Sequence, residues 1–224
     1  EGATVYGANL EGKLTWSILQ LQGGLTLTQN RYDKPEEWGQ RADFLSNGFP
    51  VIFDTTDELG NPIKAVNKKQ ESNIITRTPS AYGYFTLGIT PVKNFDIALT
   101  GTITGPMYVP HAIKYGSTQQ PNSGYPEGFD EEALQNYLVA GGLEKDTEIR
   151  IDELKKTPTF FDMGFKLSYD FDFFSSTCLQ IYAGMNNLLN AMQSDYDKGA
   201  DRDSGYIYGP TMPRSAFLGM KLSF

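Results

Sequence analysis

The chain has 224 residues and a formal net charge of −8, and 39% of its residues are hydrophobic. This length is enough to bury a core, whereas the acidic balance argues against nucleic acid as a partner. A single cysteine and a single histidine exclude an intramolecular disulfide and a Cys/His zinc cluster, and no apolar run reaches the roughly 20 residues of a transmembrane helix.

Seven segments alternate apolar and polar residues with period two. They are 5–16, 19–29, 82–90, 95–104, 160–171, 178–186 and 215–224. In the clearest, 160–171, Phe165 and Leu167 fall on one parity and Lys166 and Ser168 on the other. Such alternation indicates a strand with one apolar face. The sequence therefore predicts an all-β, antiparallel fold of about seven strands, several of them longer than the roughly 5–6 residues usual in soluble proteins.

The predicted connections are alternately short and long. Short ones are expected around Ser17 and at 90–94 and 172–177, and long ones at 33–78, 110–157 and 191–205. The second long connection contains a predicted helix, DEEALQNYLV, with Asp130 as its N-cap and Gly141 just past its end. Three connections of this length are rare in a compact soluble domain, but short turns at one end and long loops at the other are typical of outer-membrane barrels.

The positions of the aromatic residues bear on the choice between a membrane barrel and a soluble β-sandwich, whose inward faces alternate in the same way. Strand directions place five aromatic residues of the apolar face at the short-turn end: Trp16, Phe95, Tyr169, Phe171 and Phe224. Aromatic rings prefer the level of the lipid headgroups. We therefore expect an antiparallel transmembrane β-barrel segment with short periplasmic turns and long extracellular loops, its apolar face toward lipid and its polar face toward the lumen.

The last 39 residues of the sequence carry a family resemblance. The motifs are NNLLN at 186–190, YGP at 208–210, PR at 213–214 and the terminal Phe224. Together they resemble the C-terminus of TonB-dependent outer-membrane receptors, particularly those of the Bacteroidetes type. The resemblance implies that Phe224 belongs to the signal read by the outer-membrane assembly machinery. A family barrel has about 22 strands, so residues 1–224 are expected to be the C-terminal part of such a barrel, without the plug domain and the N-terminal strands.

The resemblance also implies a function in the outer membrane. Such a receptor imports a scarce nutrient, such as an iron chelate, cobalamin or a glycan, and the chain would be a transporter part rather than an enzyme. Its expected partners are lipid, the remaining strands and the plug domain, with TonB reached only through segments that the chain lacks, and no cofactor is expected. The alternative is a soluble all-β ligand-binding module.

Aromatic residues among polar ones in the predicted loops suggest a ligand site, since binding pockets combine apolar surface with a few polar groups. The candidates are Trp38, Phe44, His111, Tyr115 and Tyr125. The same residues would equally suit loops that pack on one another. No nucleophile elbow accompanies His111, which we expect to be a surface-loop histidine without a catalytic role.

The loop DYDKGADRDSG places four carboxylates close together, at Asp195, Asp197, Asp201 and Asp203. Oxygen ligands at near-alternate positions could bind Ca²⁺. The glycine falls one position early for an EF-hand loop, and no Glu occupies the twelfth position. A solvated acidic loop without a metal is therefore the preferred expectation.

Overall fold

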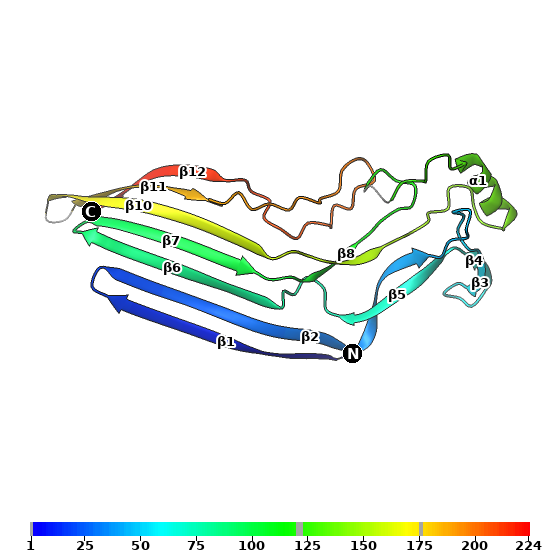
Figure 1. The fold of residues 1–224 in the computed structure, drawn as a ribbon, viewed down its shortest axis with the longest axis horizontal. Helices are drawn as coiled ribbons and strands as arrows, with labels where there is room; N and C mark the ends of the chain where they lie inside the picture. The colour runs from blue at the N-terminus through cyan, green and yellow to red at the C-terminus, as the bar shows by residue number, and fades with distance from the viewer. Residues whose placement is uncertain (1, 120–122, 175–176) are drawn as a thin grey trace.

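The computed structural model describes residues 2–119, 123–174 and 177–224. Its main feature is one antiparallel sheet in which seven long strands lie in the order β1-β2-β6-β7-β10-β11-β12 (Figure 1). Their bounds are β1 Ala3–Trp16, β2 Leu19–Ala42, β6 Ala81–Val92, β7 Phe95–Thr104, β10 Phe160–Phe174, β11 Thr177–Asn186 and β12 Ser215–Ser223. The prediction of an all-β, antiparallel fold with seven long strands is confirmed.

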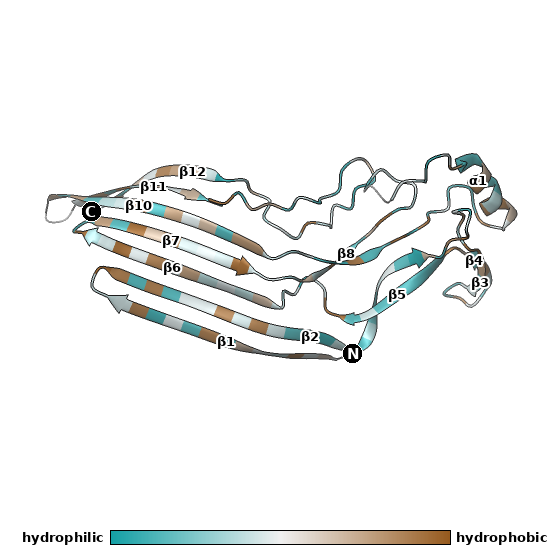
Figure 2. Cartoon of the chain, viewed as in Figure 1, coloured by the Kyte–Doolittle hydropathy of each residue, from teal (hydrophilic) through white to brown (hydrophobic). Residues whose placement is uncertain are grey.

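Cross-strand register joins the apolar positions of neighbouring strands into continuous rows. Leu21 pairs with Leu87, Leu87 with Leu99, Leu99 with Phe165, and Phe165 with Met185. Directly paired residues project to the same face of a sheet, so one apolar row crosses five strands. Figure 2 shows the resulting alternation of hydrophobic and hydrophilic residues along the strands.

The apolar face of this sheet is exposed. Leu218 and Met220 on edge strand β12 are 79% and 76% exposed, and Leu25 and Ile181 on inner strands are still 43% and 41% exposed. The main hydrophobic cluster lies away from this face: Ala42, Val66, Leu134, Leu138 and Ile149, at the far end of β2 and in the long connections. In the described residues, this cluster therefore does not include the apolar face of the long strands.

The two predicted short turns around Ser17 and before Asn94 are present, and both residues adopt positive φ, of 50° and 66°. The third predicted turn, 172–177, is shortened because β10 continues to Phe174 and β11 begins at Thr177, and residues 175–176 lie outside the described part. The C-terminus lies at the same end of the sheet as these turns, and the long connections lie at the other end (Figure 1).

Aromatic residues do gather near the short-turn end. Phe95 pairs with Tyr169 across β7 and β10, and their ring centroids are 6.5 Å apart. Tyr169 and Phe171 approach to 4.7 Å, and Trp16 is the last residue of β1, beside the first turn. Phe224 follows β12 and is 97% exposed.

The first predicted long connection, 33–78, begins later than expected and contains strands that the sequence pattern does not predict. Strand β2 continues to Ala42 and pairs there with β5 (Asn67–Ile74), and a hairpin of β3 (Phe53–Thr56) and β4 (Pro62–Ala65) connects them. Charged and amide side chains dominate both partners in this region, so the period-two signal is absent. The pairing is also interrupted by two irregularities of register, which further obscure the alternation.

The second long connection contains the predicted helix. Helix α1 spans Glu131–Ala140, the Asp130 side chain accepts a hydrogen bond from the Ala133 N–H at 2.9 Å, and Gly141 is the C-cap. A short antiparallel pair, β8 (Tyr108–His111) with β9 (Glu153–Lys156), was not expected there. No helix in the described residues has the length and apolar character to cross a membrane.

Candidate functional site

Three of the five aromatic and histidine candidates for ligand binding lie in a ring cluster within the long connections. Phe44 lies 4.6 Å from Tyr115, Tyr115 lies 5.2 Å from Tyr125, and Tyr125 stacks on Phe129 at 4.6 Å between centroids. Burial raises the pKa of the Tyr115 and Tyr125 hydroxyls. These rings contact one another beside the hydrophobic cluster. Packing between loops therefore accounts for much of their apolar surface.

Trp38 lies in a different place, on the lining of an open pocket of about 570 Å³ at the junction of β2 and β5. We call this cavity the β2–β5 pocket. Its lining residues are Glu37, Trp38, Gly39 and Gln40 from β2, Asn67 from β5, and Glu148, Arg150 and Asp152 from the connection that precedes β9. Sequence reasoning selected Trp38 but missed the polar residues, which come from three segments far apart in the chain.

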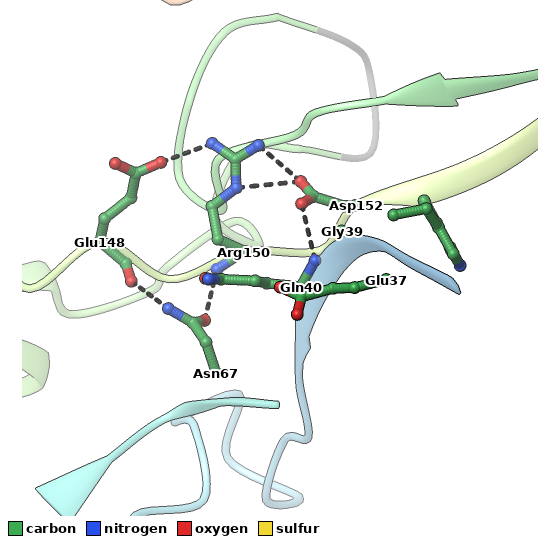
Figure 3. A pocket seen from close by; sticks show the side chains of 8 residues that line it. Glu37, Gly39, Gln40, Asn67, Glu148, Arg150 and Asp152 are labelled. Carbon is green, nitrogen blue, oxygen red and sulfur yellow. Dashed lines mark hydrogen bonds and ion pairs between the residues drawn. The ribbon is translucent and has the colours of Figure 1, made fainter. Parts of the chain in front are cut away.

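Arg150 is held between two carboxylates of the β2–β5 pocket. Its Nε lies 2.9 Å from Asp152 Oδ1, a second guanidinium nitrogen lies 2.6 Å from the same oxygen, and the third lies 2.5 Å from Glu148 Oε1. Burial alone would lower the pKa of the guanidinium, but these hydrogen bonds raise it. The cation is therefore fixed in one orientation, as Figure 3 shows.

Hydrogen bonds between side chains and backbone groups fix the walls of the β2–β5 pocket. The Asn67 side chain donates to the Glu148 carbonyl at 2.7 Å and accepts from the Arg150 N–H at 2.9 Å. Asp152 accepts from the Gln40 N–H at 3.0 Å and from the Ile113 N–H at 2.7 Å. The polar groups are thus preorganised by contacts among four chain segments: β2, β5, residues 148–152 and the residues that follow β8.

His111 departs from the predicted surface position: it is 1% exposed. Its Nε2 lies 2.9 Å from both Asp197 oxygens, its Nδ1 lies 3.5 Å from Glu153 Oε1, and its ring stacks on Tyr206 at 3.8 Å. Gln119 donates to Asp197 Oδ2 at 2.7 Å. We call His111, Gln119, Asp197 and Tyr206 the His111 clasp, because they join β8 to the last long connection.

The prediction of a solvated acidic loop is correct for Asp201, which is exposed, but wrong for Asp197, which is buried. Asp203 accepts from the Ala112 N–H at 2.9 Å, and Asp195 accepts from the Tyr206 hydroxyl at 2.9 Å and from the Tyr208 hydroxyl. The loop folds back on β8 and β9, where Asp197 contacts His111 and Asp195 contacts Lys155. No group of three or more His, Cys, Asp or Glu in the described residues is arranged to hold a metal ion.

Trp38 and His111, the other two candidates for ligand binding, also lie near each other. Both line a smaller cavity of about 170 Å³, together with Arg77, Pro110, Ala112, Asp152, Asp203 and Gly205. Trp38 and Asp152 line both this cavity and the β2–β5 pocket. The long-loop end of the molecule thus contains a hydrophobic ring cluster and, separately, two cavities with these two residues in common.

Comparison of the chain with models of protein families and with curated proteins finds no match to either.

Proposed function

We propose that the chain is part of the transmembrane β-barrel of a TonB-dependent outer-membrane receptor, which takes up a scarce nutrient such as an iron chelate, cobalamin or a glycan. The observation that supports this proposal is the exposed apolar face of the seven-strand path. Soluble monomers rarely expose contiguous apolar patches larger than a few hundred Å². The row of leucine, phenylalanine and methionine side chains that crosses five strands suits hydrocarbon instead.

The backbone arrangement is compatible with a lipid environment. Each inner strand of the path pairs with a neighbour on both sides, from β2 through β11, and backbone groups in hydrocarbon must be paired. The opposite face carries polar side chains such as Gln22, Thr86 and Lys166, which would line a lumen. In the proposed receptor, lipid contacts the apolar face and other barrel strands pair with β1 and β12. The plug domain and TonB are its other proposed partners.

The test is the facing of adjacent residues on β10. Spin labels at positions 165, 166 and 167 would be examined in protein reconstituted into lipid vesicles. Labels at Phe165 and Leu167 are expected to be accessible to an apolar quencher, and a label at Lys166 to an aqueous one. As an energetic check, Leu167→Arg should lower the free energy of unfolding by about 2–4 kcal/mol if the position is near the midplane, and Lys166→Arg should change it little.

A soluble all-β module makes the opposite prediction. It would remain monodisperse without detergent, and positions 165 and 167 would be shielded from both quenchers by a protein core. That combination would reject the membrane assignment.

A further inference from the structure

We propose that a small pocket on the polar face of the seven-strand sheet binds a divalent metal cation, with Ca²⁺ as the best match. We call this cavity of about 80 Å³ the Gly164 pocket. Its lining residues are Thr100, Gly101 and Thr102 from β7, Asp162 and Gly164 from β10, and Asn186 and Asn187 at the end of β11. This site goes beyond the proposed function and does not depend on it, because it lies on the face opposite to the exposed apolar one.

The lack of a side chain at Gly164 leaves room for a ligand. Gly164 pairs with Thr100 on β7. A Cβ at position 164 would lie 3.3 Å from Thr100 Oγ1, 3.8 Å from Asn186 Oδ1 and 3.1 Å from the Met185 carbonyl oxygen. Three oxygens from the two strands that flank β10 thus surround the space that a side chain would fill. The Thr100 hydroxyl donates to the Gly164 carbonyl at 3.3 Å, so its lone pairs can still accept a cation.

Asp162 supplies negative charge to the Gly164 pocket. It pairs with Thr102 and projects to the same face as Gly164, because the two residues are two positions apart on one strand. In the part of the chain that the structure describes, Asp162 Oδ1 is buried and has no hydrogen-bond partner. A buried polar atom without a partner costs free energy, and more so when it is charged. A bound cation would remove this cost.

The lining favours a metal ion over an organic cation. Among the described residues, it has no cationic side chain and no aliphatic or aromatic side chain to contact the carbon atoms of an ammonium or guanidinium ligand. The next cation along β10 is Lys166, whose Nζ lies 4.5 Å from the centre of the Tyr182 ring. Tyr182 pairs with Ser168, on the side of Lys166 away from Asp162. Lys166 is therefore held elsewhere and does not neutralise Asp162.

The ligand atoms favour a hard metal. They are all oxygens: the Asp162 carboxylate, the hydroxyls of Thr100 and Thr102, and the Asn186 amide oxygen. Such ligands suit Mg²⁺, Ca²⁺ and Mn²⁺ rather than softer metals. The set has one carboxylate, and is thus distinct from a cluster of three or more acidic, histidine or cysteine ligands, which the described residues lack.

Geometry and charge favour Ca²⁺ among the hard cations. Ca²⁺ accepts about 6–8 ligands in flexible arrangements that include water, whereas Mg²⁺ requires a near-ideal octahedron. The attraction of a carboxylate for a cation scales with the charge of the cation, so Na⁺ and K⁺ are disfavoured. With only one carboxylate in the pocket, we expect a dissociation constant of about 10⁻⁴–10⁻³ M.

Calorimetry on the full chain refolded in detergent would measure the binding. Potassium chloride at about 0.15 M ionic strength screens diffuse attraction to the acidic chain and supplies a monovalent competitor. The probes are CaCl₂ and MgCl₂, with methylguanidinium chloride as an organic cation. Ca²⁺ should bind saturably and more tightly than Mg²⁺ or methylguanidinium. The urea midpoint of unfolding should also rise with the Ca²⁺ concentration, because the ion binds the folded state.

Two variants of the pocket and one matched control identify the site. Asp162→Asn keeps the shape of the side chain but removes its charge, and should weaken Ca²⁺ binding about tenfold or more. Gly164→Ala should act in the same direction without removing a ligand, because its methyl group would lie 3.3 Å from Thr100 Oγ1. Asp170→Asn is the control: it removes the same charge from the same strand and face, where Asp170 accepts from Gln180 at 2.8 Å. Its affinity for Ca²⁺ should be unchanged.

Absence of saturable Ca²⁺ binding, or unchanged binding in both Asp162→Asn and Gly164→Ala, would overturn the inference. An equal loss in Asp170→Asn would also overturn it, because the charge of the sheet rather than the pocket would then attract the ion. Tighter binding of methylguanidinium that Asp162→Asn removes would reject a metal as the ligand. The spin-label test on β10 is independent of these results, because its apolar arm reports on the opposite face.

Discussion

His111 and Asp197 face each other across 86 positions of sequence, with Nε2 2.9 Å from both carboxylate oxygens. Both side chains are 1% exposed. The contact joins β8 to the last long connection, and Asp197 also accepts from the Asp203 N–H at 2.9 Å. The carboxylate is therefore the central acceptor of the His111 clasp.

Replacing this carboxylate should loosen the last long connection. In Asp197→Ala, the Gln119 amide and the Asp203 N–H lose a buried acceptor, and each unsatisfied group costs about 1–3 kcal/mol. We expect a lower unfolding midpoint in urea and faster proteolysis within residues 191–205. Asp201→Ala, in the same loop but exposed, is the control. Equal behaviour of the two variants would show that the clasp does not hold the loop.

The tyrosines around Asp195 should ionise late in an alkaline titration. Burial, and then the hydrogen bond to the Asp195 carboxylate, raise the pKa of Tyr208 from 10.0 to about 12, and the pKa of Tyr206 is raised for the same reasons. A raised pKa means that the neutral phenol is favoured in the folded state. The stabilisation is therefore complete below pH 10 and is lost as the pH rises toward 12.

Ultraviolet difference spectra would measure the tyrosine titration. Tyr208→Phe should remove one late-ionising group, and Asp195→Asn should shift the remaining ones toward lower pH without reaching the ordinary value, because burial persists. Burial raises the pKa of Asp195, but hydrogen bonds from Tyr208, Tyr206 and Lys155 outweigh it and lower the pKa. The contribution of Asp195 should thus be present above pH 3.8 and be lost as the pH falls through its lowered pKa. A single tyrosine transition near the ordinary value would contradict this arrangement.

The two ends of the seven-strand path should drive association in detergent. Strands β1 and β12 stand at the ends of the path, and unpaired backbone groups in hydrocarbon cost several kcal/mol each. We expect the chain alone to associate edge to edge or to require further strands, rather than to form a closed monomeric pore. Mass measurement in detergent, combined with conductance across a planar bilayer, would test this. A monodisperse monomer with stable channel currents would be the contrary result.

Calcium should bind weakly or not at all to residues 195–203. Asp195, Asp197 and Asp203 already accept hydrogen bonds from tyrosine hydroxyls, a glutamine amide and backbone N–H groups, and a cation would have to displace these donors. Calorimetry with Ca²⁺ on the folded chain is the measurement. Saturable micromolar binding that Asp197→Ala and Asp201→Ala both remove would mean that the loop rearranges into a metal site.

Local sequence patterns were sufficient to predict the seven long strands and helix α1. Alternation located all seven long strands because one face of each is apolar, and the parity of Phe165 and Leu167 agrees with the register across β7 and β10. The start of α1 was predictable because its N-cap is a local interaction: the Asp130 side chain accepts a hydrogen bond from the Ala133 N–H, three residues away. Strand β5 and the second half of β2 were missed because their polar faces leave no periodic signal.

The candidate site depended on contacts that sequence spacing does not encode. Trp38 was recognisable as an aromatic among polar residues, but Asn67 and Arg150 line the same pocket only because β2, β5 and the connection before β9 converge. The same holds for His111, whose burial follows from the folding back of residues 191–208. The sequence by itself determined which residues share a face, because side-chain direction along a strand is a local property. Only the tertiary structure decided which loops meet, because those contacts join segments that are far apart in sequence, such as Gln40 and Asp152, which are 112 residues apart.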